Sequence, residues 1–172
     1  PPPAPVLTSP ADNLKTNQTT VNVVGTSSQG SEVRIRLNGV TASDWSAFTG
    51  GTFTRSVTLS EGANAVTAEA RNIHGASAAS APRNVILDTT VPVVSELSIA
   101  GISVQDGTAL TETVNLTLKV SDTNGISSVT AQFNGATLPV ASGSGGYTIT
   151  LNPIALANGG YPLRVRITHS AG

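Results

Sequence analysis

Hydrophobic and polar residues alternate along most of the chain, and no stretch keeps the period of an amphipathic helix. Val33, Ile35 and Leu37, for example, alternate with Arg34 and Arg36. A period of two with one polar face is typical of an antiparallel sheet that packs on one side. The alternating segments are 19–25, 32–37, 52–59, 64–71 and 83–88 in the first half, and 114–120, 129–133, 147–151 and 161–168 in the second. The pattern predicts an all-β fold.

Turn residues divide the chain into two similar halves. Asn38-Gly39 closes one strand and Asn134-Gly135 closes another 96 residues later, and such pairs favour tight hairpin turns. Three further landmarks recur at offsets between 92 and 97 residues. They are Gly51-Thr52-Phe53 with Gly145-Gly146-Tyr147, Val57-Thr58-Leu59 with Ile149-Thr150-Leu151, and Asn64…Gly75 with Tyr161…Gly172. The repeat predicts two tandem immunoglobulin-like β-sandwiches.

These landmarks also set the predicted domain boundaries. Residues 1–5 are expected to form a Pro-rich linker, residues 6–90 the first sandwich and residues 91–172 the second. After Gly75 the first copy continues into a final strand, whereas the second copy reaches Gly172 without one. We therefore expect the second sandwich to lack its last strand. Either the chain is cut at that point, or a strand from another chain fills the gap by β-augmentation.

The first copy resembles a known family of bacterial immunoglobulin-like repeats. Its segments Asn38-Gly39, Gly51-Thr52-Phe53 and Glu61-Gly62-Ala63-Asn64-Ala65-Val66 come in that order, and it closes with Asp88-Thr89-Thr90-Val91-Pro92. Over residues 5–92 this succession is similar to repeats related to the accessory domain of glucodextranase. Residues 93–172 resemble the wider bacterial immunoglobulin and fibronectin type III-like group. The resemblance implies adhesins, stalks of surface proteins or accessory domains of secreted enzymes, and it carries no catalytic residue.

Charge and composition exclude several classes of function. The net charge is −1 and no stretch concentrates Lys or Arg, so we expect no nucleic-acid binding. No apolar run is long enough to span a bilayer, so we expect no membrane insertion. The absence of Cys removes disulfides and thiolate chemistry. Since no paired carboxylates, nucleophile elbow or phosphate-binding loop can be found, we expect that the protein is not an enzyme.

One segment offers a candidate binding site. Asp44 and Trp45 lie in residues 41–48, which we expect to form a loop between two strands. A Trp beside an Asp could stack on a sugar ring and bond its hydroxyls. We favour instead a Trp that caps one end of a core short of aromatic residues. Arg34 and Arg36 are expected to lie on a solvated face.

Metal ligands are few. Calcium prefers oxygen ligands, and these could come from Asp88 at the connector and from Asp122 or Asp106 in loops of the second half. Because residues 121–125 fit an Asx turn better than a calcium loop, we expect no cofactor. The two histidines, His74 and His169, are expected to be surface or loop-packing residues.

We therefore expect a structural spacer or presentation module within a larger exported bacterial protein, outside the cell or on its surface. Its partners would then be the neighbouring domains of the same chain. The alternative is an adhesion module that binds a polysaccharide or a protein through the loop around Trp45.

Overall fold

The structure, a computed structural model that describes residues 1–153 and 156–171, divides into two compact units. Unit 1 spans Pro1–Thr89 and unit 2 spans Thr90–Ser170. The described residues form strands and turns only, and no helix among them is long and apolar enough to cross a membrane. The all-β prediction is therefore confirmed. The division falls between Thr89 and Thr90, and the finer boundaries of the predicted domains stay a prediction.

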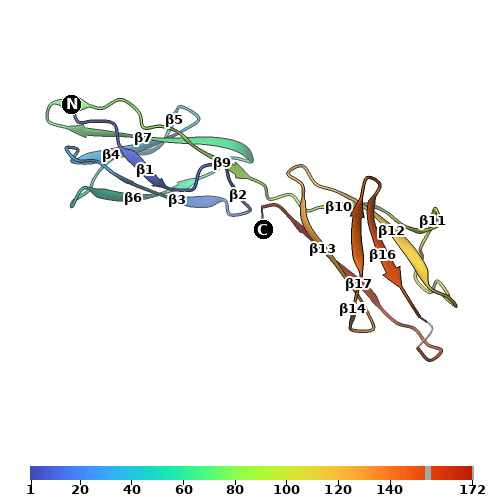
Figure 1. The fold of residues 1–172 in the computed structure, drawn as a ribbon. Coiled ribbons are helices and arrows are strands. Elements are labelled where there is room, and N and C mark those ends of the chain that lie inside the picture. The colour runs from blue at the N-terminus through green and yellow to red at the C-terminus, as the bar shows by residue number, and fades with distance from the viewer. Residues whose placement is uncertain (154–155, 172) are drawn as a thin grey trace. The chain divides into compact units, whose positions relative to one another are not determined.

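Unit 1 is a sandwich of two sheets (Figure 1). Its strands are β1 (Val6–Ser9), β2 (Leu14–Thr16), β3 (Thr20–Thr26), β4 (Glu32–Leu37), β5 (Val40–Ala47), β6 (Thr52–Thr58), β7 (Gly62–Asn72), β8 (Gly75–Ala76) and β9 (Arg83–Leu87). One sheet has the order β1-β3-β6, and the other has the order β2-β9-β7-β4-β5, with β8 paired to β7. β2 pairs with β9 in parallel, whereas the other strand pairs of unit 1 are antiparallel.

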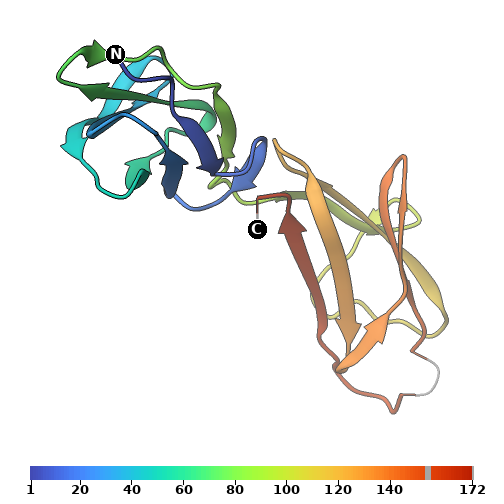
Figure 2. The same ribbon diagram turned by 60° about the vertical axis from the view of Figure 1, so that its left-hand side comes forward.

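Unit 2 repeats this arrangement. Its strands are β10 (Val93–Ile99), β11 (Ile102–Ser103), β12 (Val114–Ser121), β13 (Ile126–Phe133), β14 (Ala136–Leu138), β15 (Val140–Gly143), β16 (Gly146–Leu151) and β17 (Leu163–His169). The sheet orders are β11-β10-β12-β16-β15 and β14-β13-β17. Figure 2 shows β13 and β17 side by side in one layer of the unit and β12 and β16 in the other.

The predicted repeat holds for the central strands of both sheets. The order β1-β3-β6 of unit 1 recurs as β10-β12-β16, and the order β5-β4-β7 recurs as β14-β13-β17. Among the described residues of unit 2, no strand corresponds to β9, so β17 has a strand partner on one side only. This agrees with the predicted lack of a last strand. Gly172, the expected counterpart of Gly75, lies outside the described residues.

Each unit has its own hydrophobic core, built by the inward positions of the alternating segments. The core of unit 1 includes Val33 and Ile35 of β4, which are fully buried, and Phe53 of β6. Leu116, Leu118, Ile149 and Leu151 form the centre of the core of unit 2. Burial of such side chains stabilises each unit by roughly 1.5–3 kcal/mol per residue before the entropy of ordering is counted.

Both Asn-Gly pairs form hairpin turns, as predicted. Asn38 and Gly39 have φ of 52° and 80° between β4 and β5, and Asn134 and Gly135 have φ of 48° and 80° between β13 and β14. Two consecutive residues with positive φ are the requirement of a type I′ turn, whose twist matches that of the strands it joins. Asn is one of the few residues other than Gly that tolerates this conformation.

Asn64 organises the turn that joins β6 to β7. Its side chain is buried, with 2% relative exposure, and its amide nitrogen donates to the carbonyl oxygens of Ser60 at 2.7 Å and Gly62 at 2.9 Å. Its Oδ1 accepts the backbone N–H of Ser60 at 2.9 Å. The side chain thus satisfies three backbone groups of the turn.

The alternation pattern did not predict every strand, and β5 and β10 are two of those that it missed. Residues 41–48 were expected in a loop, whereas residues 41–47 belong to β5. The register between β4 and β5 shifts twice, between Val33 and Ile35 and between Ile35 and Arg36. β10 pairs with β12 through a similar irregularity between Val94 and Glu96. An extra residue at a bulge reverses the parity of the side chains that follow, so the period of two is hidden in both segments.

Replacement of Asn64 by Ala should lower the free energy of unfolding of unit 1 by about 2–3 kcal/mol, because it leaves buried backbone groups without partners. Urea unfolding followed by circular dichroism measures the effect. Asn22→Ala, at an exposed position of β3, is the matched control and should change the unfolding free energy by less than about 0.5 kcal/mol. Equal losses in the two variants would show that the Asn64 network does not stabilise the turn.

Candidate functional site

The outward face of the six-stranded sheet in unit 1 carries a cluster of charged side chains around the single Trp. Since β4 turns Val33 and Ile35 into the core, it turns Glu32, Arg34 and Arg36 outward. The antiparallel register with β7 places Arg34 opposite Glu69 and Glu32 opposite Arg71. Opposite charges therefore lie directly across from one another, which is the favourable cross-strand arrangement. Arg34 and Arg36 thus lie on the outward face, as expected, but both are ion-paired and only partly exposed.

The ion pairs of this cluster are close. Arg34 donates its Nε–H to Glu69 at 2.6 Å, and Arg36 reaches the other oxygen of the same carboxylate at 3.3 Å. Arg71 holds both oxygens of Glu32, at 2.6 Å and 3.1 Å, which is the bidentate geometry that a guanidinium favours. Glu69 is 8% exposed although it lies on the outward face, because the two arginines cover it.

Trp45 completes the cluster from β5. The guanidinium carbons of Arg34 and Arg71 lie 4.6 Å and 4.7 Å from the centroid of the indole ring, within the range of a cation–π interaction. The ring is half-buried and lies outside the core cluster of unit 1. Trp45 therefore does not cap the end of the core, as was expected. It covers paired arginines on the outward face of the sheet.

Arg55 of β6 holds the strand that carries Trp45. It donates to the carbonyl oxygens of Ser46 at 3.1 Å and Ala47 at 2.8 Å, and to the hydroxyl of Ser46 at 2.6 Å. β6 belongs to the other sheet of the sandwich, so this arginine fastens the free edge of β5 across the gap between the sheets. Asp44 is exposed beside Trp45, and its Oδ1 accepts the backbone N–H of Trp45 at 2.7 Å.

A hollow of about 640 Å³ opens beside Trp45. Glu32, Arg34 and Arg71 contribute to its lining, and Ile73 stands at its rim with 95% of its surface exposed. A hollow of this volume is within the range of ligand sites, although typical ligand sites are more apolar.

The electrostatics of the cluster are balanced. The hydrogen bond from Arg71 lowers the pKa of Glu32 below its ordinary value of 4.5. The same bond raises the pKa of Arg71, and the charge of Asp44 adds to that effect. Three arginines face three carboxylates, those of Glu32, Asp44 and Glu69, so the face carries no net charge to attract an ionic ligand.

Comparisons with known proteins agree with this architecture. Residues 3–88 match the family described as glucodextranase, domain B, and residues 98–165 match the bacterial Ig domain family. The chain belongs to the glucodextranase domain B family. It is also 34% identical over 168 residues to Bacillopeptidase F of Bacillus subtilis (strain 168), which covers 98% of this chain and 11% of that protein. The chain thus spans about a tenth of the length of this curated relative.

The fold of this member of the glucodextranase domain B family is similar to that of a solved structure. The fibronectin(III)-like modules of Clostridium thermocellum CbhA superpose with a TM-score of 0.53 at 18% identity, over 97% of this chain and 86% of that one. The likeness shows the fold alone. The matched domain families are non-catalytic immunoglobulin-like modules of larger bacterial proteins, and the resemblance that the sequence indicated is confirmed.

The metal candidates of this immunoglobulin-like chain are spread over both units. Asp88 follows β9 and donates its backbone N–H to Thr16 at 2.9 Å. Asp122 follows β12, where its Oδ1 accepts the N–H of Asn124 at 3.0 Å in the predicted Asx turn. Its Oδ2 lies 3.9 Å from Nδ1 of His169. Among the described residues, neither unit by itself gathers three His, Asp or Glu side chains at metal-binding distance. The expectation that the protein holds no cofactor stays a prediction.

The connections between the residues around Trp45 could not be predicted from the sequence. Glu69 and Arg71 alternate with the buried residues of β7, so their outward direction was predictable. Their partners were not, because a pairing across strands depends on the register of β4 against β7. The one signal in the sequence is that opposite charges, Arg34 and Arg36 against Glu69, occupy outward positions of two segments.

Acid should loosen the cluster around Trp45. A depressed pKa means that the stabilisation from Glu32 is present above its ordinary pKa and is lost as the pH falls through the lowered value. Trp45 emission, followed from neutral to acid pH, should therefore show a transition below pH 4.5 as Arg71 is released. Glu32→Gln should lack this transition. An identical titration in the variant would show that Glu32 does not control the position of the ring.

Proposed function

We propose that this chain is a spacer that presents neighbouring domains within a larger bacterial protein. The single observation that carries the proposal is the closed network around Trp45. The ring is covered by Arg34 and Arg71, and both arginines are already bonded to carboxylates of the same unit. A ligand that stacked on the ring would have to displace a guanidinium and leave a carboxylate without its partner.

The comparisons support the part of this proposal that makes the chain a module of a larger bacterial protein. The chain is similar to about a tenth of a large peptidase, and the domain families that it matches are accessory modules. Each unit has its own core and therefore has what a repeated structural module needs. We also propose that the parent protein is exported, since a weakly charged chain without Cys suits that setting.

A domain swap in the parent protein tests the spacer function. Replacement of residues 1–172 by an unrelated pair of β-sandwich domains of the same length should preserve the activity or adhesion of the parent. Deletion of the segment should reduce it. Loss of function after the swap, comparable to that after deletion, would show that the surface of this chain matters and would contradict the proposal.

The second candidate function is a binding module at the hollow beside Trp45, favoured by the exposed Ile73 at its rim. Because the chain has one Trp, its emission and its quenching by acrylamide report on this site alone. The spacer proposal predicts that a panel of neutral and acidic polysaccharides leaves both signals unchanged. A saturable change that is absent when Ile73 is replaced by Asp would establish binding at this hollow.

A further inference from the structure

The first and last strands of the larger sheet in unit 1 pair in parallel. β2 lies beside β9 in the register Leu14 with Val85, Lys15 with Ile86 and Thr16 with Leu87. The carbonyl oxygen of Thr16 also accepts the N–H of Asp88 at 2.9 Å, which extends the ladder past the end of β9. The segment that enters the sheet and the segment that leaves it are therefore bonded directly to each other.

Side-chain hydrogen bonds extend this connection at the starts of β2 and β9. Oδ1 of Asp12, just before β2, accepts the backbone N–H of Asn84 at 2.8 Å and its side-chain amide at 3.3 Å. The pKa of Asp12 is lowered, chiefly by this bond from the Asn84 backbone, so the charged carboxylate is the form that binds. Arg83 of β9 donates to the carbonyl oxygen of Leu7 at 2.6 Å and ties β1 to the same strand.

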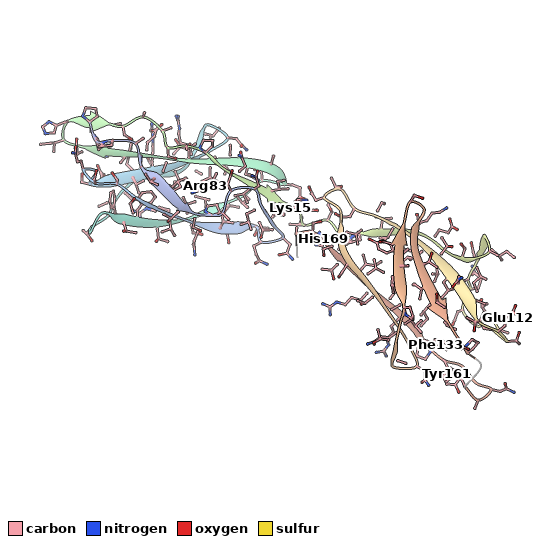
Figure 3. All side chains as sticks on the ribbon, viewed as in Figure 1. Lys15, Arg83, Glu112, Phe133, Tyr161 and His169 are labelled. Atoms are coloured by element: carbon pink, nitrogen blue, oxygen red, sulfur yellow. The ribbon has the colours of Figure 1, made fainter. Side chains whose placement is uncertain are left out.

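The direction of these strands decides how they respond to tension. Within unit 1, the N-terminus and the end of β9 lie at opposite ends (Figure 1), and Arg83 and Lys15 mark the course of the contact (Figure 3). Tension on the chain pulls the first residue of β2 toward the N-terminus and the last residue of β9 toward the C-terminus. In parallel strands these pulls run along the strands in opposite senses, so the hydrogen bonds of the pair are loaded in shear and must break together.

We propose that unit 1 is a load-bearing module in which the β2–β9 pair, with Asp12 and Arg83, acts as a clamp against stretching. The inference rests on the proposed spacer function and deepens it, because a spacer under tension must keep its length. Resistance to force is set by the barrier to unfolding and not by equilibrium stability. The clamp can therefore be tested separately from the spacer function and from the equilibrium stability of unit 1.

The absence of Cys allows the direction of pulling to be chosen in the full chain. Handles attached to Cys at Ala11 and Thr89 load the pair in shear, since these residues flank the start of β2 and the end of β9. Handles at Gln18 and Thr89 pull adjacent ends of the two strands apart, so the bonds open one after another. Optical tweezers should record an unfolding force at least about two-fold higher in the first geometry. Equal forces would overturn the proposal.

A matched pair of variants identifies the residues of the clamp. Asp12→Ala should lower the force in the shear geometry and leave the force at Gln18 and Thr89 nearly unchanged. Asn22→Ala, at an exposed position of β3, should change neither. If Asp12→Ala lowered the unfolding force equally in both geometries, the variant would be generally destabilised and Asp12 would not be part of the clamp. Suppose that the two pulling geometries give equal forces and the parent protein nevertheless tolerates the domain swap. The spacer function would then stand without the load-bearing role.

Discussion

The register between β4 and β7 is the constraint on which the rest of unit 1 depends. It sets Val33 opposite Ala70 inside the sandwich and Arg34 opposite Glu69 outside. Because side chains alternate between the faces, a slip of one residue would move Arg34 into the core and Val33 into solvent. Burial of the apolar set stabilises by more than exposed ion pairs, which contribute about 0–1 kcal/mol each. The core therefore selects the register, and the charged cluster follows from it.

Local features of the fold could be predicted from the sequence because their causes lie within a few residues. The Asn-Gly turns need two positive φ angles at adjacent positions, and the Asn64 network closes within five residues of chain. The repeat could be predicted for the same reason, since each turn recurs with its own local signature. The face that each regular strand buries followed from its period of two.

The site depended on information that no local pattern contains. Trp45 meets Arg71 only because β5, β4 and β7 are neighbours in that order, and this order is a property of the whole sandwich. The irregular pairing of β5 also removed the alternation that would have marked it as a strand. A Trp beside an Asp in an apparent loop therefore suggested a ligand site or a core cap, where the structure has a ring covering paired arginines.

The irregular register of β5 has a consequence for the behaviour of this chain among its neighbours. β5 is the last strand of its sheet, and a long, flat edge strand offers its unpaired backbone to any other strand that approaches. Two shifts in register bend β5, and Asp44 places a charge on it. Arg55 also occupies the carbonyl groups of Ser46 and Ala47. The edge is thereby a poor template for aggregation, which is an advantage for a sandwich that is followed in the same chain by a second one.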